Sequence, residues 1–257
     1  VTGYETSQRS VLQEGNGAPS TIFTINWGPS DFESISQELR LASPSDDAFS
    51  WVLGAFIFHE RGEVDNFYNL TDASFALGGI EAFDQYYVQS TDTYAAFAQA
   101  ELEITDRLNL TVGGRINHEK RDLDHSSFGT DRNGNNLLPG ALFDINLEES
   151  WTEWSGRAAL SYDFTDDIMG FVSINRGFTS GGFNTGAFND PVGALKIYDP
   201  EIVISYEAGL RTSLANNRVQ FNVTSFLYDY SDLQVFTFTA GGLQFIENAS
   251  DASIGIG

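Results

Sequence analysis

The stretch that decides the fold is residues 202–214, which read IVISYEAGLRTSL. Nearly all its even positions are apolar or aromatic, whereas the odd positions are mostly small or charged and include Glu207 and Arg211. Because successive side chains of a strand point to opposite faces, this alternation predicts a β-strand with one apolar and one polar face. Residues 219–227 alternate in the same way after the turn-forming Ala215-Asn216-Asn217, so the two segments are expected to form a hairpin.

The same alternation recurs along the chain, for example at residues 35–41 and 108–116. Helical periodicity is hard to find, and the chain is therefore predicted to be all-β. We expect about ten strands, each antiparallel to its neighbours. Their expected positions are residues 1–9, 33–43, 48–61, 91–105, 108–121, 151–164, 168–178, 201–214, 218–239 and 243–257.

The expected connections alternate strictly in length. The short ones are Pro44–Asp47, Asp106–Arg107, Thr165–Asp167 and Ala215–Asn217, and the long ones are about residues 10–31, 62–91, 122–150 and 179–200. Loops longer than roughly 12–15 residues are uncommon in soluble domains, but transmembrane barrels have short turns at one end and long external loops at the other. The pattern predicts part of an antiparallel up-and-down transmembrane β-barrel.

Composition limits the possible partners and chemistry. The net charge is −23, from 36 acidic and 13 basic residues, so nucleic-acid binding is not expected and cationic or neutral ligands are favoured. The chain has no cysteine, and His59, His118 and His125 are scattered along it. No grouping of residues suggests a nucleophile, a catalytic acid or base, or a metal site. We therefore expect neither an enzyme nor a bound cofactor.

The polar face of the predicted strands is open to two interpretations. In a soluble β-sandwich it would be the solvent side, whereas in a barrel it would line the lumen. The aromatic residues Trp51, Trp151, Trp154, Tyr162 and Phe164 lie near expected strand ends and fit the interfacial girdle of a barrel. The lumen-facing polar candidates are Glu38, Arg40, Glu101, Glu103, Arg115, Arg157, Glu207 and Arg211.

Several segments resemble the barrel of TonB-dependent receptors, and they occur in that family's order. Each match is degenerate by itself, but the ordered series covers nearly the whole chain. The segments are ISQELRLAS at 35–43 with Trp51-Val52-Leu53-Gly54, YAAF at 94–97 with LNLTVGGR at 108–115, NRGFTSGGFN at 175–184, YDPE at 198–201 with SYEAGLR at 205–211, FLYDYSDLQ at 226–234, and ENA at 247–249. Thr179 departs from the lysine that the family usually has there.

The resemblance implies active uptake across the outer membrane of a Gram-negative bacterium. Such receptors typically import ferric siderophores, haem, cobalamin or glycans, and the TonB–ExbB–ExbD complex drives them by pulling on a plug domain. Plug and final barrel strands are not found here, so residues 1–257 are expected to be one partial barrel domain that forms an open, curved sheet. The implied partners are outer-membrane lipid, the TonB complex through the plug, and a ferric siderophore or other nutrient. The external-loop candidates for contacting the nutrient are Arg176, Phe178, Phe183 and Asn184.

Two other functions remain open on the sequence. A passive, porin-like channel would have the same barrel pattern but no plug. A soluble secreted β-sandwich that binds glycans would instead pack its apolar faces against each other, without an outward-facing apolar band.

Overall fold

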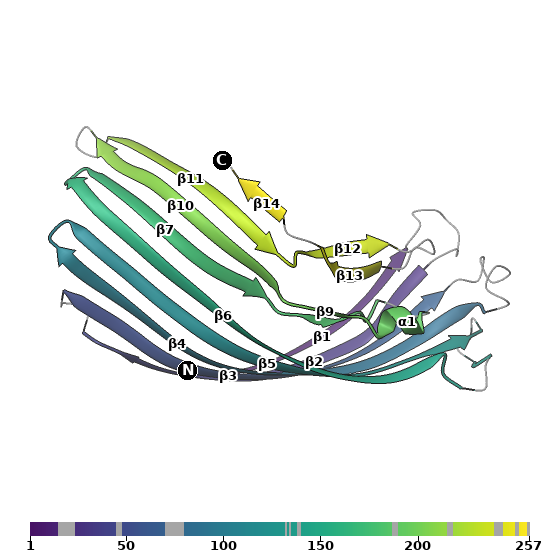
Figure 1. Ribbon diagram of the computed structural model, residues 1–257. Helices are drawn as coiled ribbons and strands as arrows, with labels where there is room; N and C mark the ends of the chain where they lie inside the picture. Colours follow the sequence, from purple (N-terminus) through teal and green to yellow (C-terminus); the bar gives the residue numbers. More distant parts are fainter. Residues whose placement is uncertain are drawn as a thin grey trace.

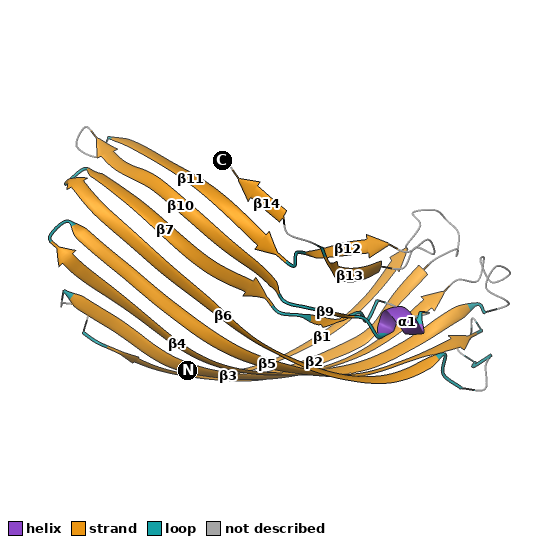
Figure 2. Cartoon of the chain, viewed as in Figure 1, coloured by secondary structure: helices purple, strands orange, loops and turns teal. Residues whose placement is uncertain are grey.

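A computed structural model of the chain shows a large, curved antiparallel sheet (Figure 1; Figure 2). The described residues are 1–14, 24–44, 48–69, 80–131, 133, 135–137, 140–186, 190–214, 218–238, 244–249 and 252–255. The main sheet has 10 strands in the order β1-β2-β3-β4-β5-β6-β7-β10-β11-β14, and β1 and β14 are its open edges. The expected up-and-down order, the number of strands and the open, curved shape are confirmed.

The strands of the main sheet differ in length. Four central ones have 21 to 24 residues, whereas β7, β10 and β11 have 12 to 14. Their bounds are β1 Thr2–Glu14, β2 Thr24–Ala42, β3 Phe49–Asn69, β4 Ala82–Thr105, β5 Leu108–Thr130, β6 Phe143–Thr165, β7 Ile168–Thr179, β10 Glu201–Leu214, β11 Val219–Ser231 and β14 Ala252–Gly255.

Much of the chain expected to form long loops is strand. Residues 62–69 pair with 82–89, and residues 122–127 pair with 143–148. Their Gly, Asn and Asp residues resemble loop composition, but Val64, Tyr68 and Leu123 are buried on one face while the acidic side chains between them point to the other. The turn at Asp106–Arg107 is confirmed; the predicted connections at 45–47 and 215–217 lie outside the described residues.

The prediction of single strands at 218–239 and 243–257 is wrong. The first segment divides into β11 and β12 (Gln234–Phe238), and the second into β13 (Gln244–Asn248) and β14. Asp232 has a φ of 54°, a left-handed conformation that interrupts a strand. The Asn248 side chain then donates to Asp232 O at 2.8 Å, and β12 pairs with β13 in a separate hairpin.

The strand register separates the side chains into an outer, convex face and an inner, concave face (Figure 1). The outer face carries a continuous band of exposed apolar side chains, which we call the apolar belt. Its residues include Ile35, Leu39, Leu53, Ile57, Tyr94, Leu102, Val112, Ile116, Trp154, Leu160, Val172, Ile174, Leu210, Val223 and Leu227. On β5 it spans residues 108–116, which at roughly 3.3 Å per residue and a tilt of roughly 40° gives a height of about 20–23 Å.

Aromatic side chains border the apolar belt. Tyr162 and Phe164 meet edge to face, with ring centroids 5.1 Å apart, at the end of β6 next to the short turn. Trp154 is exposed on the outer face where the belt gives way to polar residues at the other end. These three fit the predicted girdle, but Trp151 does not, because its parity places it on the inner face, where it lies 6.3 Å from the Phe183 ring.

A cap covers the inner face at the end opposite the short turns. We use this name for residues 180–200 together with the β12–β13 hairpin (Figure 1). Residues 180–200 contain β8 (Gly182–Phe183), the short helix α1 (Pro191–Ala194) and β9 (Ile197–Tyr198). Phe143, Ala194 and Phe245 form a buried cluster that joins the cap to β6. Within the described part of the chain, no helix is long and apolar enough to cross a membrane.

The belt yields a prediction about stability. Val112 lies near its middle and is 42% exposed, so we expect Val112→Arg to destabilise the protein in a bilayer by about 2–4 kcal/mol. Thr111→Arg places the same charge on the inner face and should cost less. The free energy of unfolding in lipid vesicles measures both, and equal losses would contradict the assignment of the two faces.

Candidate functional site

The inner face holds all eight polar residues predicted to line a lumen. The register links them row by row: Glu38 and Arg40 lie on β2, Arg115 on β5 and Arg157 on β6. Glu207 pairs with Ser173 and Arg211 with Met169 on the same face. Glu101 and Glu103 have the parity of Phe97, which is also on this face. The shared face is therefore established, whereas contact with a ligand or plug stays a prediction.

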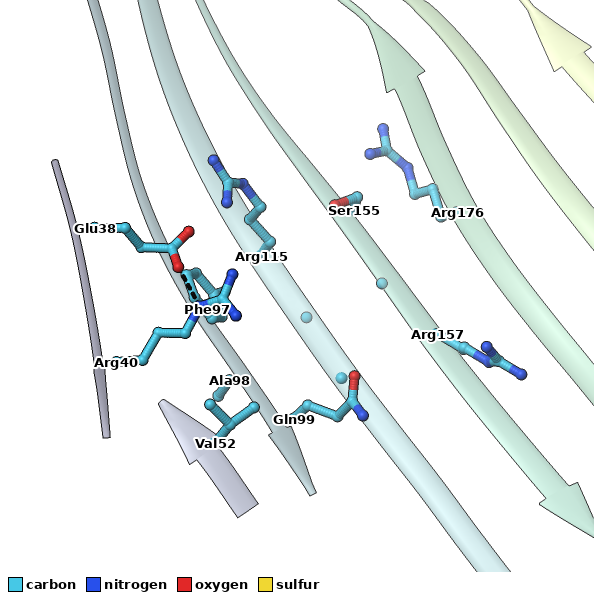
Figure 3. Close-up of a pocket in the computed structure, with 13 residues that line it drawn as sticks. Glu38, Arg40, Val52, Phe97, Ala98, Gln99, Arg115, Ser155, Arg157 and Arg176 are labelled. Carbon is cyan, nitrogen blue, oxygen red and sulfur yellow. Dashed lines mark ion pairs between the residues drawn. The ribbon is translucent and has the colours of Figure 1, made fainter. Parts of the chain in front are cut away.

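The inner face contains a hollow of about 510 Å³, which we call the arginine groove (Figure 3). It lies behind the apolar belt and crosses strands β2 to β7. Four arginines line it with only one carboxylate, although the chain as a whole is strongly acidic. The lining residues are Glu38, Arg40, Val52, Phe97, Ala98, Gln99, Gly113, Gly114, Arg115, Ser155, Gly156, Arg157 and Arg176.

Phe97 organises one side of the arginine groove. Its ring lies against Gly54 on the neighbouring strand, where a Cβ atom would clash with it. The guanidinium groups of Arg115 and Arg40 lie 5.7 Å and 5.9 Å from the ring centroid. Arg115 is also 5.2 Å from the Phe56 ring. Stacking on aromatic faces holds these guanidinium groups in place and leaves their N–H donors available.

The charges of the groove are only partly neutralised. Arg40 forms an ion pair with Glu38 (Figure 3), and Arg115 donates from Nε to Asn117 Oδ1 at 2.7 Å. Within the described ranges, neither Arg115 nor Arg157 has a carboxylate within ion-pair distance. Guanidinium groups bind carboxylate and phosphate oxygens in a two-pronged geometry. The inner face is therefore locally basic here, unlike the expectation drawn from the net charge.

Sequence reasoning selected the arginines but missed Phe97 and the glycines beside it. Gly113 lies on the inner face and keeps the floor of the groove free of a side chain, whereas Gly114 and Gly156 have the parity of the outer face and contribute only backbone. The Gly-Gly-Arg run at 113–115 and Gly54 at the end of Trp-Val-Leu-Gly were visible in the sequence. Only the register shows that Gly54 and Arg115 both lie opposite Phe97.

The external-loop candidates lie in or near the cap and have structural partners. Phe183 and Asn184 are only 6% and 4% exposed. Asn184 donates to Lys196 O at 3.1 Å and Ile246 O at 3.0 Å and accepts from Ile246 N at 2.7 Å, so it joins residues 180–200 to β13. Phe178 is half-buried on β7. Their contact with a nutrient stays a prediction.

Arg176 borders the arginine groove from β7, but its guanidinium group is bound to β6. It donates to Trp154 O and to Glu153 Oε2, the latter at 2.9 Å, and lies 4.5 Å from the Trp154 ring centroid. Gly156–Arg176 is the last pair of β6 with β7. Arg176 therefore stabilises the point at which the two strands separate.

A buried hydrogen-bond network attaches the cap to the long strands β3, β4 and β5, in the part of these strands that extends beyond the apolar belt. Gln85 Nε2 donates to Thr185 O at 2.6 Å and contacts His125 Nε2 at 2.8 Å. Its Oε1 accepts from Asn66 at 3.0 Å and Tyr68 at 3.1 Å. Because Gln85 Nε2 can only donate, His125 Nε2 must accept and the imidazole is neutral. Burial accordingly lowers the pKa of His125 to about 4.

The three histidines do not converge. His59 Nδ1 lies 2.8 Å from Asp92 Oδ1, His118 Nδ1 lies 2.8 Å from Thr152 Oγ1, and His125 is buried under the cap. Among the residues that the structure describes, no group of His, Asp and Glu could hold a metal ion. The Asp131 side chain accepts from Asn133 N and Asn135 N at 2.8 Å and 2.9 Å.

Comparison with known proteins identifies the fold. The family described as "TonB dependent receptor-like, beta-barrel" matches residues 2–254, nearly the whole chain. The chain belongs to the TonB-dependent receptor family. Members of this family are outer-membrane transporters and not enzymes, as the sequence predicted.

Relatives of this TonB-dependent receptor chain are distant in sequence. The pesticin receptor of Yersinia enterocolitica is 25% identical over 242 residues, covering 91% of this chain and 32% of that protein. The ferric-pyoverdine BN7/BN8 receptor of Pseudomonas putida is 24% identical over 180 residues, which is 68% of this chain and 19% of that receptor. The chain thus spans a third or less of the length of these relatives.

Solved structures share the fold. The ferric yersiniabactin uptake receptor FyuA from Yersinia pestis matches with a TM-score of 0.76 at 21% identity, over 99% of this chain and 35% of that one. The copper transporter OprC matches with a TM-score of 0.63 at 15% identity, over 91% of this chain and 34% of that one. At these identities the likeness establishes the fold alone.

Packing at Gly54 gives a testable prediction for this TonB-dependent receptor chain. Gly54→Ala should destabilise the protein by about 1–3 kcal/mol, because the added Cβ displaces the Phe97 ring from the inner face. In Phe97→Leu the ring is gone, so adding Gly54→Ala should cost much less. A double-mutant cycle on the free energy of unfolding tests this coupling, and additive effects would contradict it.

His125 gives a prediction about pH. Its pKa is lowered from an ordinary value of about 6.5 to about 4, so attachment of the cap is complete above about pH 6.5 and weakens as the pH falls toward 4. When His125 Nε2 is protonated it becomes a donor that faces the donor Gln85 Nε2, so the hydrogen bond between them is lost. Hydrogen exchange at residues 180–186 should rise over this window, and His125→Gln should abolish the rise. An unchanged pH profile in that variant would refute the mechanism.

Proposed function

We propose that this chain forms part of the barrel wall of a receptor that imports a ferric siderophore-like chelate, or another large nutrient, with energy from TonB. The observation that carries the proposal is the family match over residues 2–254. Among the relatives, the ferric-pyoverdine receptor is named for a ferric chelate, which supports that class of substrate.

The proposal assigns residues 1–257 to one partial barrel domain. A plug domain elsewhere in the same polypeptide would connect the barrel to the TonB–ExbB–ExbD complex. Outer-membrane lipid would contact the apolar belt, because an exposed apolar band of about this height matches the lipid-facing surface of a barrel. No nucleic acid and no cofactor enter this function.

The polar inner face supports a role in transport. Among the described residues, Arg115 and Arg157 have no carboxylate partner, and they present their guanidinium groups toward the concave side of the sheet at the height of the apolar belt. Carboxylate or catecholate oxygens of a chelate, or acidic side chains of the plug, suit such donors. The cap and its residues Phe183 and Asn184 would shape the entrance from outside the cell.

The two alternatives from the sequence fare differently. The β-sandwich is contradicted, because the main sheet exposes its apolar face and no second sheet covers that face in the described structure. A passive channel shares the barrel geometry, and the family match favours the receptor over it.

Uptake assays test the proposal directly. Cells that make the whole protein should accumulate radioactive iron from a panel of ferric siderophores, and inactivation of TonB should reduce this uptake to background. Arg115→Ala combined with Arg157→Ala should lower uptake several-fold at equal surface abundance, whereas Thr111→Ala, on the same face, should leave it unchanged. Uptake that persists without TonB would instead support a passive channel.

A further inference from the structure

Strand β6 has a long edge without a strand partner. It pairs with β5 from Phe143 to Tyr162, but with β7 only from Gly156 to Thr165. β7 ends at Thr179, and the chain then enters the cap on the inner face (Figure 1). Among the described residues, positions 143–155 of β6 therefore have no strand on the side away from β5. We call residues 144–152 the free edge.

The direction of the peptide groups along the free edge follows from two side-chain contacts. Arg176 donates to Trp154 O from the β7 side, and the Glu149 carboxylate accepts from Ser150 N at 3.1 Å. Asp163 N, at an odd position, bonds toward β5 through Arg107 O at 2.8 Å. Because N–H and C=O of one residue point to the same side, the even-numbered residues present theirs at the free edge.

The free edge lies outside the membrane. Trp154 is the last belt residue of β6, and Thr152, Ser150 and Glu148 follow it on the outer face. Unpaired peptide groups there can be hydrated, which would be impossible in lipid. Ser150 is shielded by Glu149, but Asp144, Asn146, Glu148 and Thr152 have no backbone partner in the part of the chain that the structure describes.

The side chains along the free edge alternate in character. Asp144, Asn146 and Glu148 are exposed on the outer face, whereas Ile145, Leu147 and Trp151 are half-buried on the inner face. Lys120 on β5 pairs with Glu148 at 3.1 Å, but Asp122 and Asp124 lie on the same outer face, so carboxylates outnumber this one cation. A strand added here would place its outward side chains beside this acidic surface and its inward side chains beside apolar groups. A second copy of this edge would bring carboxylates against carboxylates, so the charge disfavours pairing between two copies.

We propose that the free edge binds an extended polypeptide from outside the cell by strand addition, and that this segment alternates basic and apolar side chains. Main-chain hydrogen bonds to Asp144, Asn146 and Glu148 supply affinity, and the alternating faces supply selectivity. Arg176 and Glu149 occupy the neighbouring edge groups, so they limit the strand that can be added to the segment between residues 144 and 152.

Peptide binding to the whole protein in detergent micelles tests the proposal. The probe is a fluorescent nine-residue peptide of alternating Lys and Val. It should bind, and the same peptide N-methylated on alternate amides should bind about tenfold more weakly, because it loses main-chain hydrogen bonds without changing charge. Equal binding of the two peptides would overturn strand addition, as would no binding of the first.

Variants of the receptor locate the site. Asn146→Pro removes an N–H that points to the free edge and leaves the hydrogen bonds to β5 in place, so it should weaken binding about tenfold. Asp144→Lys with Glu148→Lys should weaken it similarly. Glu63→Lys with Asp65→Lys, two outer-face changes on β3, is the matched charge control and should bind normally. An equal loss in that control would show nonspecific attraction and contradict the proposal, even if Asn146→Pro failed to fold.

Discussion

The requirement that every peptide group in lipid be hydrogen-bonded governs this structure. Antiparallel pairing satisfies that requirement between strands, and it also fixes which side chains share a face. A slip of one residue would turn the apolar belt inward and the arginines outward. The continuous register from Ile35 on β2 to Leu227 on β11 is therefore the feature on which both the belt and the arginine groove depend.

Glycine and aromatic residues adapt the two faces to this register. Phe97 lies on Gly54, Phe171 lies on Gly209, and Arg211 lies 5.3 Å from the Phe171 ring. Each ring covers backbone that the glycine leaves bare and provides a flat surface for a guanidinium group. The inner face thereby holds guanidinium groups in fixed positions against aromatic rings.

Beyond the apolar belt, the chain no longer has to satisfy its peptide groups by strand pairing alone. The structure uses that freedom in two ways. Residues 180–200 and the β12–β13 hairpin fold onto the inner face and are held there through Asn184 and Gln85. The same departure of the chain after Thr179 leaves the edge of β6 uncovered, so the anchored cap and the proposed docking edge have one structural origin.

The sequence by itself determined the strand class, the order of strands in the main sheet and the face shared by the eight polar candidates, but it placed Trp151 on the wrong face. Period-2 alternation is a local property, and residues such as Glu207 and Leu210 show it without any partner. Only the tertiary structure decided where strands end, because Asp232 and Gly62 are compatible with either strand or loop until neighbours pair with them. It also decided the arginine groove, since Arg40 and Arg115 are far apart in the chain and meet through pairing across β3 and β4.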